Sequence, residues 1–224
     1  VGGSSHRRGG CVDNIVSFQI VTVDGAEHWC NKYSEEQPEL FDAALCGLGQ
    51  FGIITQVTIP LVPAPEEVAY FTVGYHNPKK FFKDQKTLYE SGLFDHLKGF
   101  VRKVGNQWNY FIEVGSYGQE DNRSARAELL KHLPCDLQKI PYWDFINQVT
   151  KFTEALKDKG ALNNPLPWYN VLVPEKAIQE HLALALNSKF LTGTEPIIVY
   201  PMNSKHFKVP FFKRPEGTFY LLGV

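Results

Sequence analysis

The stretch Pro60–Glu67 constrains the fold most strongly, because it contains three prolines. Proline has no amide hydrogen and a fixed φ, so such a stretch cannot lie inside a helix or in the middle of a sheet. The hydrophobic pattern also changes across it. We therefore predict a domain boundary here, between a first part over residues 1–62 and a second part over residues 63–224.

The first part has the pattern of three strands and one helix. Ile15–Val23 is rich in β-branched residues and is followed by Asp24-Gly25, a hairpin signal, so a return strand is expected over Ala26–Cys30. Glu35–Cys46 has the apolar spacing of a helix, and Ile53–Leu61 alternates as a strand does.

The second part mixes strands and helices without the regular order of a parallel α/β sheet. This pattern favours the α+β class, with an antiparallel sheet covered by helices on one face. Strands are expected over Glu67–Tyr75, Leu93–Val104, Trp108–Tyr117, Pro167–Val173, Ile197–Tyr200 and Thr218–Leu222, and helices over Lys79–Glu90, Asp121–Leu133, Trp143–Lys159 and Pro174–Leu191.

The composition argues against several classes of function. The 23 basic and 24 acidic residues give a formal charge of −1, whereas proteins whose main partner is nucleic acid carry a basic excess. No apolar run approaches the roughly 18 residues that a membrane helix needs. The four cysteines have no C-x-x-C spacing and the seven histidines are scattered, so no metal centre is expected. We therefore expect neither a nucleic acid nor a membrane as partner.

Two glycine-rich stretches could meet a ligand. Val1–Gly10 combines glycines with serines and arginines, so its backbone can approach a ligand closely and its donors suit an anion such as a pyrophosphate. A solvated loop explains the same composition. Gly47–Thr55 places three glycines at a helix-to-strand junction, which suits either close approach to a flat group or an ordinary helix end and turn.

A third stretch holds aromatic side chains beside asparagine and proline at the ends of predicted strands. It comprises Asn164–Asn170 and Tyr200–Asn203. Such groups suit a planar, apolar ligand with a few polar anchors, and they equally suit core positions with a hydrogen-bonded tip. The sequence has no Gly-x-Ser-x-Gly elbow and no His-Glu-x-x-His pair.

These stretches resemble the cytokinin dehydrogenases, flavoenzymes of the vanillyl-alcohol oxidase superfamily. The opening Gly2–Arg7 is similar to the family's glycine-rich passage, and Gly47–Thr55 (GLGQFGIIT) is nearly identical to its most recognisable string. The resemblance continues in order through Phe94–Phe100, Pro167–Pro174 and Val199–Asn203, so it spans almost the whole chain.

The resemblance implies a fold and a cofactor. Residues 1–62 would be the second half of a PCMH-type FAD-binding domain. Residues 63–224 would be a substrate-binding (cap) domain, truncated at its C-terminus, whose sheet covers the flavin ring. The cofactor would be FAD. The implied FAD-binding residues are Val1, Gly2, Gly3, Gln50, Gly52 and Ile53, and the implied substrate-binding residues are Lys98, Trp168 and Asn170.

The resemblance also implies what the chain lacks. The histidine that joins the flavin covalently and the aspartate that takes a proton from the substrate would lie upstream of residue 1, and a closing strand would lie beyond residue 224. We therefore expect no catalytic residue within this chain and expect the isolated chain to be inactive. Its partners would be the remaining parts of the same flavoenzyme.

Lys98 departs from the family's pattern. The family usually has Tyr-Val-Glu-Gly where this chain has His96-Leu97-Lys98-Gly99, and that glutamate lies at the substrate entrance. A carboxylate suits the N–H donors of an adenine ring, whereas an ammonium suits an acceptor or an anion. Either Lys98 points to solvent, or the substrate is planar or apolar with an anionic group, which leaves cytokinin itself open.

The predicted function is that of an FAD-dependent dehydrogenase or oxidase that transfers hydride from an amine or alcohol carbon to flavin N5. Its small-molecule substrate would be a cytokinin or another planar, apolar amine or alcohol, and oxygen or a quinone-like acceptor would reoxidise the flavin. Two alternatives stay open: a related sugar or alditol oxidase, and a non-catalytic binding module of the same fold.

Overall fold

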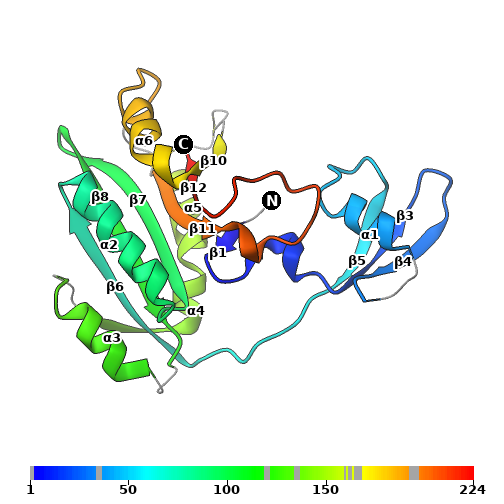
Figure 1. The fold of residues 1–224 in the computed structure, drawn as a ribbon, viewed down its shortest axis with the longest axis horizontal. Coiled ribbons are helices and arrows are strands. Elements are labelled where there is room, and N and C mark those ends of the chain that lie inside the picture. The colour runs from blue at the N-terminus through cyan, green and yellow to red at the C-terminus, as the bar shows by residue number, and fades with distance from the viewer. Residues whose placement is uncertain are drawn as a thin grey trace. The chain divides into compact units, whose positions relative to one another are not determined.

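The computed structural model describes residues 3–33, 37–118, 122–133, 137–158, 160, 163, 168–191 and 197–224 (Figure 1). The chain divides into two compact units, Val1–Pro63 with Met202–Thr218, and Ala64–Pro201 with Phe219–Val224. The division of the sequence into an FAD-binding domain over residues 1–62 and a substrate domain over residues 63–224 stays a prediction. The structure adds that a segment from late in the chain belongs to the first unit.

The first unit contains a three-stranded antiparallel sheet. Its strands are β3 (Ser17–Val21), β4 (Glu27–Asn31) and β5 (Ile53–Thr58), in the order β4-β3-β5. Alternation along β3 directs Phe18 and Ile20 into a core, where Phe41 of α1 (Pro38–Ala44) stacks on Phe18 with ring centroids 5.2 Å apart. Shorter elements are β1 (Gly3–Ser5), β2 (Gly9–Gly10) and the 3-10 helices η1 (Cys11–Asn14) and η5 (Ser204–His206).

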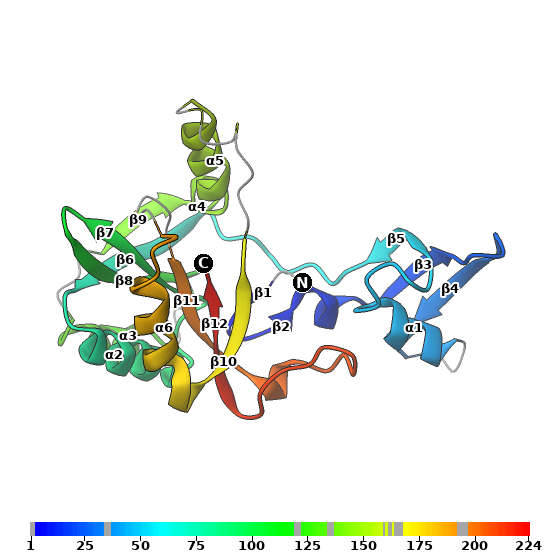
Figure 2. The same cartoon turned by 90° about the horizontal axis from the view of Figure 1, so that it is seen from above.

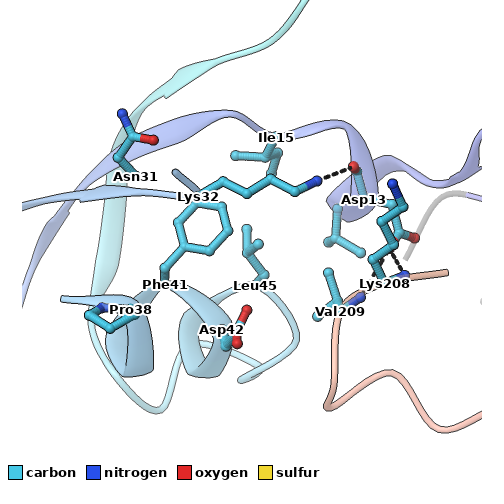
Figure 3. Close-up of a pocket in the computed structure, with 11 residues that line it drawn as sticks. Asp13, Ile15, Asn31, Lys32, Pro38, Phe41, Asp42, Leu45, Lys208 and Val209 are labelled. Atoms are coloured by element: carbon cyan, nitrogen blue, oxygen red, sulfur yellow. Dashed lines mark hydrogen bonds between the residues drawn. The ribbon is translucent and has the colours of Figure 1, made fainter. Parts of the chain in front are cut away.

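One carboxylate holds the segment Met202–Thr218 in the first unit (Figure 3). Asp13 accepts backbone N–H hydrogen bonds from Lys208 at 2.5 Å, from Val209 at 3.1 Å and from Gly10 at 2.9 Å. Val209 is thereby buried in the core that β3 and α1 form. Because Asp13 and Val209 are 196 positions apart, no local pattern in the sequence predicts this contact.

The second unit is a seven-stranded sheet with helices (Figures 1 and 2). The strand order is β10-β12-β11-β7-β8-β6-β9, and the pairs β10–β12, β11–β7, β7–β8, β8–β6 and β6–β9 are antiparallel. This confirms the predicted α+β class. The strands are β6 (Glu67–Tyr75), β7 (His96–Val104), β8 (Gln107–Ser116), β9 (Gln138–Pro141), β10 (Asn170–Pro174), β11 (Ile197–Asn203) and β12 (Thr218–Gly223). The helices are α2 (Pro78–Ser91), α3 (Arg123–Leu130), α4 (Tyr142–Ile146), α5 (Gln148–Asp158) and α6 (Ile178–Leu186).

Strand alternation gives this sheet two different faces. The inner face carries Leu97 and Val101 of β7 and Ile112 and Val114 of β8, all of them buried. Figure 2 shows α2 and α6 on one side of the sheet and α4 on the other. The apolar side of α2, which includes the fully buried Phe81, packs into the same core as these strands.

Close contact between α2 and the sheet depends on Gly99 in β7. A Cβ added at Gly99 would collide with the carbonyl oxygen of Val199 in β11 and with the side chain of Gln85 in α2. Gln85 is fully buried and donates from Nε2 to that same oxygen at 3.0 Å. The glycine therefore lets a buried amide tie the helix to a strand, as buried polar groups require a partner.

Two of the predicted helices are interrupted. Trp143–Lys159 forms α4 and α5, because the side chain of Asn147 donates to the carbonyl of Trp143 at 2.9 Å and ends the first helix. Pro174–Leu191 starts with a 3-10 turn before α6, and β9 was not predicted at all. The other predicted elements are present, with bounds shifted by no more than three residues. No helix in the described part of the chain is long and apolar enough to cross a membrane.

We expect Asp13→Ala to lower the free energy of unfolding by about 1–3 kcal/mol, because it removes the acceptor of part-buried backbone amides. Asp42→Ala, on α1 in the same unit (Figure 3), is the matched control and should unfold like the wild type. Urea denaturation followed by circular dichroism measures the difference. Equal stability of the two variants would show that Asp13 does not anchor the returning segment.

Candidate substrate and cofactor surfaces

The face of the seven-stranded sheet opposite α2 carries groups that could meet a ligand. Alternation along β7 and β8 places them there, and the register sets Glu113 opposite Lys98 and Phe111 opposite Phe100. The adjoining strands β6 and β11 contribute further members. We call this surface the outer face, and it comprises Tyr70, Thr72, His96, Lys98, Phe100, Arg102, Phe111, Glu113 and Ile198.

Two stacked phenylalanines form the middle of the outer face. The rings of Phe100 and Phe111 have centroids 5.0 Å apart and are inclined by only 13°. Gly74 lies opposite Phe111 in the register, so the ring of Phe111 covers its backbone. The guanidinium of Arg102 lies 4.7 Å from the centroid of Phe111, and Nζ of Lys98 lies 5.9 Å from that of Phe100. An aromatic platform flanked by cations suits a planar ligand.

A buried carboxylate lies beside this platform. Glu113 is 8% exposed, and Nε2 of His96 lies 3.1 Å from its Oε1. Burial raises the pKa of Glu113, but the hydrogen bond from His96, the charge of Lys98 and a hydrogen bond from Tyr70 together bring the pKa below its usual value. An ionised carboxylate only accepts, so Nε2 of His96 carries the hydrogen in this contact.

Aromatic rings lie at one end of the polar group that His96, Glu113 and Lys98 form. Burial raises the pKa of Tyr70 to about 12, so its hydroxyl keeps its proton, and Thr72 donates to that hydroxyl at 3.2 Å. Phe145 of α4 packs edge-on against His96 with centroids 4.9 Å apart. Gly115 lies against both residues, since a Cβ added there would lie 3.2 Å from the Cβ of His96 and 3.4 Å from Cζ of Phe145. The pair of His96 and Glu113 is therefore closely packed by aromatic neighbours.

Trp168 and Asn170 lie together at the far edge of the same sheet, where β10 begins. Nε1 of Trp168 donates to Oδ1 of Asn170 at 2.8 Å, and the indole is half exposed. A Cβ added at Gly223 would lie 2.6 Å from that Oδ1, 3.4 Å from the indole and 3.6 Å from Ile198. Because Ile198 pairs with Phe100, these two predicted substrate residues lie on the outer face, as Lys98 does.

The predicted cofactor residues of the first unit lie on an exposed, partly apolar loop and strand. Gln50 is exposed in the turn after α1, and Gly52 has φ of +148°, a conformation that favours glycine. Ile53 opens β5 and is 73% exposed, and a Cβ added at Gly49 would meet no atom within 4 Å. This open backbone and exposed apolar surface fit a flat cofactor such as FAD.

Only one of the other three predicted cofactor residues lies within the described part of the chain. Gly3 begins β1, whereas Val1 and Gly2 lie outside the described residues. The ligand roles of all the predicted site residues stay predictions. Sequence reasoning did not single out His96 or Glu113. Two features of the sequence indicate them. His96 lies two positions before Lys98 and therefore on the same face of the strand, and Glu113 is a lone acid in the apolar part of β8.

Known proteins resemble this chain over all or part of its length. A family model described as "Cytokinin dehydrogenase 1, FAD and cytokinin binding" matches residues 109–224. An uncharacterized oxidoreductase in the fasciation locus of Rhodococcoides fascians is 33% identical over 232 residues, covering 100% of this chain and 52% of that protein. Cytokinin dehydrogenase 1 of Arabidopsis thaliana is 28% identical over 260 residues, covering 99% of this chain and 45% of that protein.

Solved structures share the fold. The xylooligosaccharide oxidase of Myceliophthora thermophila aligns with a TM-score of 0.60 at 20% identity, covering 99% of this chain and 52% of the oxidase. The chain spans about half the length of the curated relatives that it matches. The predicted resemblance, fold class and FAD cofactor are thus confirmed at the level of the family.

Glu113→Gln should lower the free energy of unfolding by about 1–3 kcal/mol at pH 7, because it replaces a charged, hydrogen-bonded acceptor in a buried position. The folded-state pKa of Glu113 is depressed, so its ionised form stabilises the fold above its unfolded pKa, and that stability is lost as pH falls through the folded pKa. The gap between variant and wild type should therefore shrink on acidification.

Glu128→Gln on the exposed side of α3 is the control, since its partner Lys131 is a surface neighbour. Urea denaturation at pH 7 and below pH 4 measures both variants. If Glu113→Gln matched the control at pH 7, or if its deficit were the same at both pH values, Glu113 would not be an ionised buried group.

Proposed function

We propose that this chain, which belongs to the cytokinin dehydrogenase family, supplies the substrate-binding surface and part of the cofactor site of an FAD-dependent oxidoreductase. Bound FAD would accept at N5 a hydride from an amine or alcohol carbon of the substrate. The residues of this chain bind and orient the substrate, and none of them is proposed to react covalently.

The outer face is the observation that carries the proposal. It combines an aromatic platform, a half-exposed indole and a compact polar group on one side of a rigid sheet. Phe100 and Phe111 would hold a planar ring by its face, and Trp168 would cover an apolar substituent with its indole fixed by Asn170. Rigid placement matters because orientation of the reacting carbon lowers the activation barrier.

The polar group defines which substrate atoms would fit. Lys98 lies opposite the ionised Glu113, so this end of the surface holds a cation and an anion side by side. Lys98 donates, whereas the ionised carboxylate of Glu113 accepts. A planar substrate that carries both a ring acceptor and an N–H donor satisfies both groups, and the adenine ring of a cytokinin is one such substrate. The charge on Lys98 alone therefore does not require an anionic substrate.

The cofactor is proposed to contact the first unit through its backbone and one exposed strand. Gly3, Gln50, Gly52 and Ile53 would lie along FAD together with Val1 and Gly2, because glycine permits close approach and Ile53 offers apolar surface. All residues of β5 are exposed, although several are apolar. We propose that FAD and the remaining parts of the same flavoenzyme cover this strand.

An absorption spectrum of the full-length gene product tests the cofactor assignment. A band at about 450 nm is expected from bound flavin, and its survival through acid precipitation would mean covalent attachment. Anaerobic bleaching by isopentenyladenine would identify a cytokinin substrate, and bleaching only by an oligosaccharide would favour a sugar oxidase. No band after addition of FAD would favour a non-catalytic binding module and overturn the proposal.

Lys98→Gln should lower kcat/KM for a bleaching substrate by about tenfold, because a charge-assisted hydrogen bond contributes roughly 1.5–3 kcal/mol. Lys103→Gln is the matched control, since Lys103 lies on the same strand but on the other face. Stopped-flow reduction of the flavin measures both variants. Identical rates for Lys98→Gln and wild type would mean that Lys98 points to solvent.

A further inference from the structure

A small cavity opens where α2 meets α6, on the side of the sheet that these two helices share (Figure 2). Its lining comes from α2, from the first turn of α6 with the 3-10 turn before it, and from Tyr220 of β12. All of these elements belong to the second unit. The cavity lies on the side of the sheet opposite the outer face, so the proposed function does not use it.

Three lysines of α2 line this cavity. Lys79, Lys83 and Lys86 are separated by four and three positions, which places them on one side of the helix. Like charges at this spacing repel one another and weaken a helix unless a counter-charge lies beside them. The next question is therefore which of the three ammonium groups has such a counter-charge.

One of these lysines is paired and the other two are not. Nζ of Lys86 lies 2.5 Å from Oε1 of Glu175 and 3.6 Å from Oε1 of Glu90. Within the described part of the chain, the ammonium groups of Lys79 and Lys83 have no ion-pair or hydrogen-bond partner. Because the lining holds three lysines and a single acid, Glu175, it carries a net charge of +2.

A buried hydroxyl adds a further polar group to the cavity. Tyr220 is 2% exposed, and its ring packs edge to face on Phe82 of α2 with centroids 5.6 Å apart. Its hydroxyl has no hydrogen-bond partner among the described residues, yet it is not one of the fully enclosed polar atoms that lack a partner. The hydroxyl of Tyr220 therefore opens onto the cavity that this residue lines.

This hydroxyl acts as a donor. Burial raises the pKa of Tyr220, and the charges of Glu175 and Glu90 act in the same direction, so the hydroxyl keeps its proton. Buried polar groups normally have a partner, so an unpartnered donor that opens onto a cavity indicates a hydrogen bond to a molecule that enters. With two unpaired ammonium groups beside it, that molecule is expected to be an anion.

We infer that this cavity binds the phosphate group of a small anion, either inorganic phosphate or the end of a phosphate ester. Lys79 and Lys83 balance its charge, and the hydroxyl of Tyr220 donates to one of its oxygens. A phosphate group carries about two negative charges and several strong acceptors, which match this lining better than a monocarboxylate does. Its volume of about 180 Å³ has room for a phosphate with water, since one water takes roughly 30 Å³.

The site is separate from the proposed cofactor and substrate surfaces and needs no flavin. The inference therefore goes beyond the proposed function and holds or fails independently of it.

Isothermal titration calorimetry of the folded full-length gene product tests the inference at constant ionic strength. Excess FAD stays in the buffer, so that the probes do not report an empty cofactor site. Inorganic phosphate and glycerol 3-phosphate are the probes, and at least one of them is expected to bind at one site per chain. Acetate should bind at least about tenfold more weakly, because it has one charge and fewer acceptors.

The two probes distinguish the two sources of the phosphate group. Equal affinity would mean that the site recognises the phosphate group alone. Binding of glycerol 3-phosphate that is at least about tenfold tighter would mean that the ligand is a phosphate ester, whose organic part makes further contacts. Both results support the inference.

Single substitutions locate the site. Lys83→Gln and Tyr220→Phe should each weaken binding of the phosphate probe at least about fivefold, because each removes one donor to the anion. Tyr220→Phe should leave the unfolding temperature of the ligand-free protein unchanged, since the hydroxyl has no partner there. Lys176→Gln is the matched control, because Lys176 is exposed on the turn before α6, does not line the cavity and gives the same change in net charge.

A cooperative thermal melt confirms that each variant is folded before titration. Absence of binding by both probes would overturn the inference. It would also be overturned if acetate bound as tightly as phosphate, if Lys176→Gln weakened binding as much as Lys83→Gln, or if Tyr220→Phe bound phosphate like the wild type.

Discussion

The register between β7 and β8 is the constraint on which the second unit depends. It sets Lys98 against Glu113 and Phe100 against Phe111. Side chains of a strand alternate between the two faces, so a slip of one residue would move the charged set into the core and the apolar set into solvent. The inner core and the outer face are thus consequences of one pairing. Gly99 reinforces it, since only glycine there lets α2 approach the strands closely.

The electrostatics of the outer face follow from that pairing. An ionised carboxylate as buried as Glu113 would be costly alone, but cross-strand neighbours supply a hydrogen bond from His96 and the nearby charge of Lys98. The carboxylate of Glu113 in turn accepts the hydrogen on Nε2 of His96 and lies opposite the charge of Lys98. The sequence alone shows only the positive charge of Lys98. In the structure, Lys98 and Glu113 form a paired donor and acceptor beside the aromatic platform, which is a more selective arrangement for a planar ring.

Local patterns predicted most of the fold because alternation and helical spacing are local properties. The strand over Ile53–Thr58 and the helix after Asn77 follow from them directly. Two features were out of reach for physical reasons. The interruption at Asn147 depends on one side chain competing with the backbone, and the anchoring of Val209 by Asp13 joins distant parts of the chain.

The candidate site was predicted in part. Lys98, Trp168 and Asn170 were proposed from a resemblance, and the structure places all three on one face. The role of Glu113 depends on its neighbours across the strands, which a sequence does not display. A crystal structure of the full-length enzyme with FAD and an unreactive adenine-type ligand tests the account most directly. It should show the ligand ring over Phe100 and Phe111, with a polar atom about 3 Å from His96 or Lys98. A ligand bound away from the outer face would contradict the account.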